Sequence, residues 1–261
     1  MDAVPHTTSP GGTTLGGSVT LGCTGRPPAP RRAAQPPGRG GDVTGDTVPP
    51  ANLRNEYAAD LGLTETNLAG DWYTQFDRWF TEAVAAGLPE PNAMVLGTAD
   101  AAGRPSARTV LLKGYGPDGF VLFTNYGSRK GTELAASPYA SLVFPWFVLE
   151  RQVAVTGRVE RLDRAETEAY FASRPRGSQL GAWASEQSRV LPDRAALDAA
   201  YRAMAERFVD GAPIPAPPHW GGFRIRPDEV EFWQGQASRL HDRLRFRVTD
   251  GGDWVVERLA P

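Results

Sequence analysis

The chain has 261 residues, a formal net charge of −2 and one cysteine, Cys23, so an internal disulfide is excluded and a reducing cytoplasmic location is expected. Its near-neutral charge argues against a general nucleic-acid binder, and it lacks a run of 18 apolar residues that could cross a membrane. The three histidines are too scattered along the chain for a zinc site, so no metal is expected.

Residues 1–50 differ in composition from the rest of the chain. They contain 10 Gly, 9 Pro and no Phe, Trp or Tyr. A segment with so little apolar surface cannot offset the entropy lost on ordering, so we expect it to be disordered. A regulatory tail and a translation start assigned too far upstream are both open interpretations. The folded domain is then expected over residues 51–261.

The first predicted element is a helix that begins at residue 71. One face packed in a core is indicated by the helical spacing of Trp72, Phe76, Trp79, Phe80 and Val84, and Gly87 then Pro89 end the helix. Short strands separated by turns follow, with one short helix among them at 128–136. These strands are expected at 93–98, 106–115, 120–124, 140–149 and 152–162.

The second half of the chain begins with two predicted helices, at 164–173 and 194–209. A loop of small and polar residues is expected between them, over 176–188. Four more strands are expected, at 222–226, 230–233, 242–248 and 254–258. Successive short strands with tight turns predict an antiparallel meander that closes into a barrel, so the fold class is mainly β with flanking helices.

Only two lysines, Lys113 and Lys130, accompany 26 arginines. In so arginine-rich a chain, each lysine marks a position where a compact ammonium group could be needed. Arg108 and Lys113 are five residues apart, so on a strand they point to opposite faces unless its twist brings both to one pocket. A surface strand with charged ends is the alternative interpretation.

The stretch 124–130 leaves a predicted strand, turns at Gly127 and enters a helix with Ser128 as the expected N-cap. Free backbone N–H groups, a hydroxyl and the cations of Arg129 and Lys130 would meet at this helix start. Such an arrangement predicts an anion site that fits a phosphate monoester. An ordinary capped surface helix is the alternative.

A second phosphate-sized site is predicted near the end of helix 164–173. Tyr170 and Arg174 are four residues apart and so share a helix face, and Ser178 follows in the expected loop. Gln152 offers both a donor and an acceptor for the edge of a heterocycle.

The stretch 231–243 carries an indole, an imidazole and several charged groups. Arg239, His241 and Arg243 are spaced by two, which on an extended backbone would place all three on one face. That pattern predicts an anion site. With two such sites elsewhere, no metal cluster and no nucleophilic Cys, the sequence favours an organic cofactor that carries a phosphate and acts on a phosphorylated substrate.

Five ordered motifs resemble the pyridoxamine 5′-phosphate oxidase family, over residues 52–261. The closing Arg-Leu-Ala-Pro, 258–261, is similar to the C-terminus of that family. Two departures are Phe123, where a tyrosine is expected, and Gln236-Ala237-Ser238, where the family is richer in glycine. The motifs are Arg-Thr-Val-Leu-Leu-Lys (108–113), Phe-Thr-Asn-Tyr-Gly-Ser-Arg-Lys (123–130), Leu-Glu-Arg-Gln-Val (149–153), Tyr-Phe-x-x-Arg-Pro-Arg-x-Ser-Gln (170–179) and Phe-Trp-Gln-Gly with Arg-Leu-His-Asp-Arg (232–243).

The resemblance implies an FMN-binding split β-barrel that forms a homodimer, with FMN at the subunit interface and the C-terminal part serving dimerisation and substrate binding. The implied reaction oxidises pyridoxamine or pyridoxine 5′-phosphate with O₂ to pyridoxal 5′-phosphate and H₂O₂, with ammonia released from the amine.

The resemblance also implies site residues, among which Arg239 and His241 are catalytic and Arg54 to Tyr57 close over the site. The other positions implied for substrate are Lys113, Tyr170, Arg174 and Ser178. The positions implied for FMN are Arg108, Val110, Leu111, Lys113, Phe123, Thr124, Arg129, Lys130, Gln152, Gln187, Ser188, Trp233 and Arg243.

The same implied assignment separates the residues of the stretch 231–243. Trp233 and Arg243 would serve FMN, whereas Arg239 and His241 would serve the substrate, with Arg239 in a loop before the strand.

Two alternative functions stay open. One is a related split barrel that uses a deazaflavin or reduces flavin, which would not need the Arg239 and His241 pair. The other is a carrier of flavin or pyridoxal phosphate that binds without turnover.

Overall fold

The structure is a computed structural model that describes Leu53, Glu56, Tyr57, residues 62–209 and residues 211–261. Apart from Leu53, the described residues belong to one compact unit, Arg54–Pro261. The predicted disorder of residues 1–50 and the predicted role of Arg54 both lie outside the described residues.

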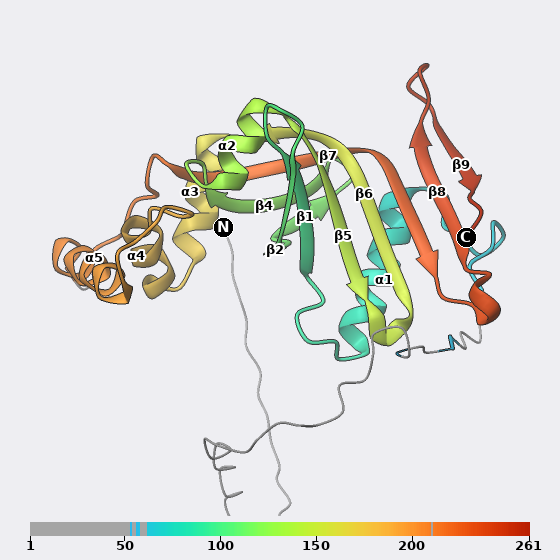
Figure 1. The fold of residues 1–261 in the computed structure, drawn as a ribbon, viewed down its shortest axis with the longest axis horizontal. Helices are drawn as coiled ribbons and strands as arrows, with labels where there is room; N and C mark the ends of the chain where they lie inside the picture. Colours follow the sequence, from blue (N-terminus) through green and yellow to red (C-terminus); the bar gives the residue numbers. More distant parts are fainter. Residues whose placement is uncertain (1–52, 54–55, 58–61, 210) are drawn as a thin grey trace, which may run out of the picture. The chain divides into compact units, whose positions relative to one another are not determined.

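Within the described residues, nine strands form one antiparallel sheet that curls into a half-barrel (Figure 1). The strand order is β2-β1-β5-β6-β7-β4-β3, and β8 pairs with both β7 and β9. The mainly β fold class is confirmed, but a simple meander is wrong, because β4 pairs with the distant β7. The strands are β1 (Ala93–Ala99), β2 (Pro105–Leu111), β3 (Gly114–Gly116), β4 (Gly119–Asn125), β5 (Tyr139–Trp146), β6 (Arg151–Arg161), β7 (Trp220–Gln234), β8 (Asp242–Val248) and β9 (Trp254–Arg258).

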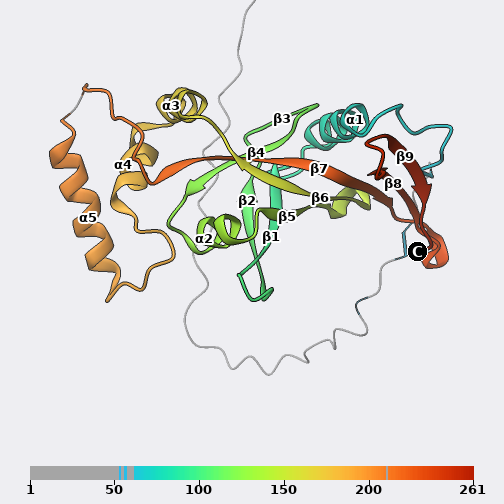
Figure 2. The same cartoon turned by 90° about the horizontal axis from the view of Figure 1, so that it is seen from above.

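Five α-helices flank the sheet in the described part of the chain. The predicted aromatic face of α1 is confirmed, since Phe76 and Trp79 are buried in the main core, whereas Val84 on the same helix is exposed. Seen from above, α3, α4 and α5 gather at one end of β7, and β8 and β9 lie at its other end (Figure 2). The helices are α1 (Trp72–Ala85), α2 (Arg129–Ala136), α3 (Arg164–Ser173), α4 (Arg176–Ala184) and α5 (Arg194–Arg207), with short 3-10 turns η2 (Phe147–Leu149) and η3 (Ala237–Arg239).

The prediction of a loop over 176–188 is wrong for most of that segment, because Arg176–Ala184 form the helix α4. Pro175 ends α3, and its carbonyl accepts the backbone N–H groups of Ser178 and Gln179, which starts the next helix at once. Leu180 on α4 packs with Phe171 of α3 in a second small core. Ser178 therefore lies in the first turn of a helix and not in a loop.

The two strands expected at 222–226 and 230–233 are one continuous strand, β7. The strand continues through Pro227, which pairs with Gly157 at a register shift between Thr156 and Gly157 of β6, where the ladder is irregular. A Cβ at Gly157 would lie 2.1 Å from the Arg226 carbonyl oxygen, so the close approach of the two strands requires glycine. The long strand links the two ends of the molecule.

The strand expected at 106–115 is divided into β2 and β3, and the one expected at 140–149 ends at Trp146 before the turn η2. No described helix is long and apolar enough to cross a bilayer. The described residues also include no group of three or more His, Cys, Asp or Glu that could hold a metal ion.

Candidate functional site

A cavity of about 700 Å³ lies where α3 and α4 meet the sheet. Four polar side chains on its wall come from separate elements: Lys113 after β2, Tyr170 and Arg174 at the end of α3, and Ser178 on α4. The predicted phosphate-sized group is therefore brought together in one cavity. Leu111, Phe123, Thr124 and Gln187 also line it. We name this cavity the helical-end pocket.

Aromatic stacking fixes the wall of the helical-end pocket. The ring of Phe123 stacks on Tyr170 with centroids 3.9 Å apart and on Trp220 at 5.4 Å. The Arg174 guanidinium lies over the Trp220 ring, 4.7 Å from its centroid. A phenylalanine at 123 in place of tyrosine therefore still supplies the stacking face, so the loss of that hydroxyl leaves this packing intact.

Arg174 is left short of partners in this wall. Its Nη1 atom is buried and has no hydrogen-bond partner among the described residues. Burial lowers the pKa of Arg174, with partial compensation from Tyr170, and burial likewise raises the pKa of the Tyr170 phenol. A buried guanidinium donor without an acceptor is unfavourable on its own, so the wall is arranged for an anionic ligand.

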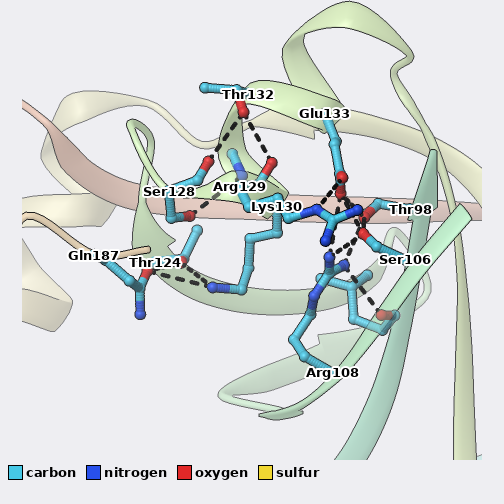
Figure 3. Close-up of polar contacts among 12 residues, drawn as sticks. Thr98, Ser106, Arg108, Thr124, Ser128, Arg129, Lys130, Thr132, Glu133 and Gln187 are labelled. Carbon is cyan, nitrogen blue, oxygen red and sulfur yellow. Dashed lines mark hydrogen bonds and ion pairs between the residues drawn. The ribbon is translucent and has the colours of Figure 1, made fainter. Parts of the chain in front are cut away.

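Next to this pocket, the start of α2 forms a cationic cradle, which we define as Arg108, Arg129 and Lys130 (Figure 3). The Lys130 ammonium donates to Thr124 Oγ1 and Gln187 Oε1, both at 3.3 Å, and so points to the helical-end pocket. Burial lowers the pKa of Lys130, repulsion from Arg108 lowers it further, and Glu133 opposes the shift.

The arginines of the cradle are held by a buried carboxylate, Glu133. Arg129 Nε donates to Glu133 Oε1 at 2.8 Å, and Arg108 Nη2 donates to Oε2 at 3.1 Å. Arg108 pairs with Glu133 of α2, whereas Lys113 lines the helical-end pocket. The two charges therefore lie in neighbouring places and not in one pocket.

Ser128 caps α2 as predicted. Its Oγ atom accepts the Gly131 N–H at 3.3 Å and donates to the Asn125 carbonyl at 2.6 Å, and the residue is fully buried. This capping orients the free N–H groups of the first helical turn beside Arg129 and Lys130. The cap therefore connects the local fold to the predicted anion site.

Replacing Ser128 by alanine is expected to lower the free energy of unfolding by about 1 kcal/mol, because the cap is lost and the Asn125 carbonyl loses a donor. Urea unfolding followed by circular dichroism measures the change. Ser137→Ala at the other end of α2 is the control, since no side-chain hydrogen bond of Ser137 caps this helix. Equal effects of the two substitutions would contradict the capping role.

A second group of predicted residues lies at the far end of β7. Tyr57, Gln152 and Trp233 line a pocket of about 250 Å³. The Trp233 ring has its centroid 4.6 Å from that of His241 and 5.7 Å from that of Tyr57. We name this group, with Arg239 and Arg243, the strand-end cluster.

The loop before β8 positions the imidazole of the strand-end cluster. The Gln236 backbone N–H donates to His241 Nδ1 at 3.1 Å, so Nδ1 is the acceptor and a neutral ring carries its proton on Nε2. Asp242 holds the same loop, since its carboxylate accepts from the Gln236 side chain and from the Leu63 backbone. The Nε2 atom is thereby left to meet a ligand.

The three residues spaced by two do not share a strand face. Arg239 lies in η3 with φ 61°, His241 precedes β8, and only Arg243 is in the strand. Ser238 also has positive φ, 57°, a conformation that glycine adopts more easily, so a glycine-richer loop is understandable in relatives. Arg243 forms a two-point ion pair with Glu231, at 2.7 and 2.9 Å.

Within one subunit, the helical-end pocket and the strand-end cluster lie at opposite ends of strand β7. Trp220 lines the first and Trp233 the second, and they are 13 positions apart on β7. At about 3.3 Å per residue, that strand length corresponds to roughly 40 Å. Figures 1 and 2 show the same separation, because α3 and α4 flank one end of β7, and β8 and β9 lie at the other.

Most predicted site residues fall into these groups. Val110 packs against the main core, and Ser188 is exposed with φ 72° beside Gln187. Sequence reasoning missed Glu133 and Trp220. Glu133 carried a usable signal, since it lies four residues after Arg129 on the same helix face.

Two family profiles match the chain. The profile of pyridoxamine 5′-phosphate oxidase matches residues 80–208, and that of the pyridoxine 5′-phosphate oxidase C-terminal dimerisation region matches residues 220–261. The second match includes β7, the loop before β8 and the rest of the C-terminus.

Curated relatives carry names from the same family. The pyridoxine/pyridoxamine 5′-phosphate oxidase of Salinispora arenicola is 91% identical over 220 residues, which cover 84% of this chain and 100% of the relative. That of Frankia alni is 56% identical over 236 residues, covering 89% of this chain and 96% of the relative.

Solved structures extend the likeness to the fold. PhzG from Burkholderia lata, solved with tetrahydrophenazine-1-carboxylic acid, is 34% identical, with a TM-score of 0.68 over 72% of this chain and 91% of PhzG. A pyridoxamine 5′-phosphate oxidase-related, FMN binding protein from Nostoc punctiforme, 16% identical, shares the fold with a TM-score of 0.58 over 71% of this chain and 97% of its own. The chain belongs to the pyridoxamine 5′-phosphate oxidase family of FMN-binding oxidoreductases.

Proposed function

We propose that the protein oxidises pyridoxamine 5′-phosphate or pyridoxine 5′-phosphate to pyridoxal 5′-phosphate, with FMN as cofactor and O₂ as electron acceptor. The oxygen is reduced to H₂O₂, and the amine substrate also takes up water and releases ammonia. The observation that carries this proposal is the helical-end pocket, where Arg174 has a buried donor without a partner beside Lys113, Tyr170 and Ser178.

The residues present fit FMN. The cationic cradle meets the N-terminus of α2, where N–H groups and positive charge suit a phosphate monoester. Thr124 and Gln187 extend this cradle into the helical-end pocket through Lys130. FMN, when bound, would accept a hydride from the substrate carbon and pass the electrons to O₂.

The side chains of the chain would bind and orient the substrate. Lys113, Arg174, Tyr170 and Ser178 would hold its phosphate by charge-assisted hydrogen bonds. Arg239 and the Nε2–H of His241 would contact the pyridine ring and its substituents. Fixing both ends of the substrate places its reacting carbon against the cofactor and excludes unproductive orientations.

The strand-end cluster can complete the site only from a second copy of the chain, because it lies at the far end of β7 from the helical-end pocket. A two-fold dimer would bring each helical-end pocket against the partner's strand-end cluster, with FMN between them. The match of residues 220–261 to a dimerisation region supports this arrangement.

Complementation between two variants that are each impaired in kcat/KM, assayed with substrate well below KM, would test the shared site. Arg174→Leu removes the helical-end pocket, and Arg239→Leu removes the strand-end cluster. In a mixed dimer one site carries both substitutions and the other carries neither. Random pairing after co-expression is expected to restore about a quarter of the wild-type activity. No recovery in mixed dimers isolated by two affinity tags would contradict a site shared between subunits.

The reaction itself is tested on the purified protein. We expect bound flavin with absorbance near 450 nm and release of H₂O₂ when pyridoxine 5′-phosphate is supplied in air (the flavin band is a general property of oxidised flavins). Colourless protein that takes up no FMN and turns nothing over would contradict the proposal. Turnover without O₂ consumption would favour a reductase, and tight product binding without turnover would favour a carrier.

A further inference from the structure

Glu133 is a buried carboxylate that accepts hydrogen bonds from four side chains. Oε2 accepts from Thr98 Oγ1 at 2.5 Å, from Ser106 Oγ at 2.6 Å and from Arg108 Nη2 at 3.1 Å. Oε1 accepts from Arg129 Nε at 2.8 Å. The residue is 5% exposed, so its position is set by these contacts and not by solvent.

The carboxylate stays ionised in this environment. Burial would raise the pKa of Glu133, but the hydrogen bonds from Ser106, Thr98, Arg129 and Arg108 outweigh burial and lower the pKa to about 2. Glu133 is therefore a fixed negative charge at neutral pH, at a place where the proposed ligand is itself an anion. A negative charge beside an anion site repels the ligand, so Glu133 is expected to contribute something that outweighs this repulsion.

The contacts indicate that role, which is to orient the cradle. Arg108 makes three further contacts: Nη1 donates to the Leu96 carbonyl and to Thr98, and Nη2 contacts Ser106. Thr98 and Ser106 also donate to Glu133, so this carboxylate is the common acceptor of the whole group (Figure 3). Removing it would release Arg129, and it would leave Arg108 on hydroxyls that have themselves lost their acceptor.

The charge of the cradle also depends on Glu133. Arg108, Arg129 and Lys130 carry three positive charges, and Glu133 carries one negative charge, which leaves a net charge of +2. A phosphate monoester carries close to two negative charges near neutral pH. The cradle with Glu133 is therefore matched in charge to a phosphate monoester.

We infer that Glu133 is a positioning residue for the phosphate of FMN, which holds Arg108 and Arg129 in the geometry that binds it. This inference rests on the proposed function, because FMN is taken as the ligand of the cradle. It opposes simple electrostatics, in which removing a negative charge beside an anion site tightens binding. The sign of the change on substitution separates the two explanations.

The experiment measures flavin affinity and not turnover. After removal of flavin from the purified protein, FMN and riboflavin are titrated separately and binding is followed by quenching of flavin fluorescence. Glu133→Gln is expected to raise the Kd of FMN about 10-fold, by analogy with the loss of a supporting contact behind a metal ligand. The Kd of riboflavin, which lacks the phosphate, is expected to stay unchanged.

Two further variants complete the design. Glu168→Gln removes an i,i+4 pair with Arg164 that has the same geometry, 2.7 Å on the exposed face of α3, and should change neither Kd. Glu133→Asp keeps the charge but withdraws the carboxylate by one methylene, so a positioning role predicts weaker FMN binding here too. If circular dichroism shows that Glu133→Gln does not fold, the Kd of FMN for Glu133→Asp still tests the positioning role.

Equal or tighter FMN binding by Glu133→Gln would overturn the inference, and so would parallel weakening of FMN and riboflavin, which indicates a general structural defect. Unchanged FMN binding by Glu133→Asp would overturn it as well, because charge alone would then suffice. A wild-type protein that binds neither flavin would contradict the proposed function instead, which keeps the two failures distinct.

Discussion

Replacing Arg239 by leucine is expected to lower kcat/KM for pyridoxine 5′-phosphate by about 100- to 1000-fold, the loss typical of removing one preorganised donor at a reacting group. Arg239 is exposed, and no hydrogen bond or ion pair joins it to another described residue. Both Arg239 and Ser238 have positive φ, which is unfavourable for residues with a side chain. A strained backbone that presents a free cation beside His241 and Trp233 fits a ligand-binding role.

The same variant should retain its flavin, because in the proposed site Arg239 contacts the substrate and the cradle holds FMN. Steady-state kinetics and the flavin absorbance of the purified protein measure the two effects separately. Arg202→Leu on the exposed surface of α5 is the matched control and should leave kcat/KM unchanged. Unchanged turnover in Arg239→Leu would remove this residue from the catalytic assignment.

The elements that could be predicted from the sequence are those with a strong local signal. The aromatic spacing of α1 and the Ser128 cap of α2 report directly on local backbone geometry. The helix α4 was missed because Gly177 and Gly181 lower its helix propensity, while its packing on α3 through Leu180 is a tertiary contact. The continuity of β7 was likewise missed, because it depends on irregular pairing with β6, which is distant in the chain.

The site could be predicted only as separate motifs. Each motif contains residues close in the chain, so local spacing was enough to group Tyr170 with Arg174 or Ser128 with Lys130. That Lys113 joins Tyr170 depends on how β4, α3 and α4 pack together, which no local pattern encodes. The distance between the helical-end pocket and the strand-end cluster depends on the length of β7, and this feature turns a list of motifs into a proposal for a shared site.

Arg174 offers the sharpest test of which ligand the helical-end pocket holds. Its guanidinium is packed on Trp220 and its Nη1 atom is buried without a partner, so the wall is already desolvated and oriented before a ligand arrives. Such a group gains most from an ionised acceptor, because a charge-assisted hydrogen bond replaces an unsatisfied donor. A phosphate on the substrate would satisfy it, and a neutral substrate would not.

Replacing Arg174 by leucine is therefore expected to raise KM for pyridoxine 5′-phosphate by about 100-fold, which corresponds to roughly 3 kcal/mol for truncating one partner of a buried charged pair. The effect on kcat should be smaller, since the phosphate lies away from the reacting carbon. Arg174→Lys keeps the charge but loses the planar stacking on Trp220, so an intermediate KM is expected. The preference for pyridoxine 5′-phosphate over pyridoxine, measured as the ratio of kcat/KM, should fall by the same factor in Arg174→Leu. An unchanged ratio would mean that this pocket does not hold the substrate phosphate, even if activity were reduced.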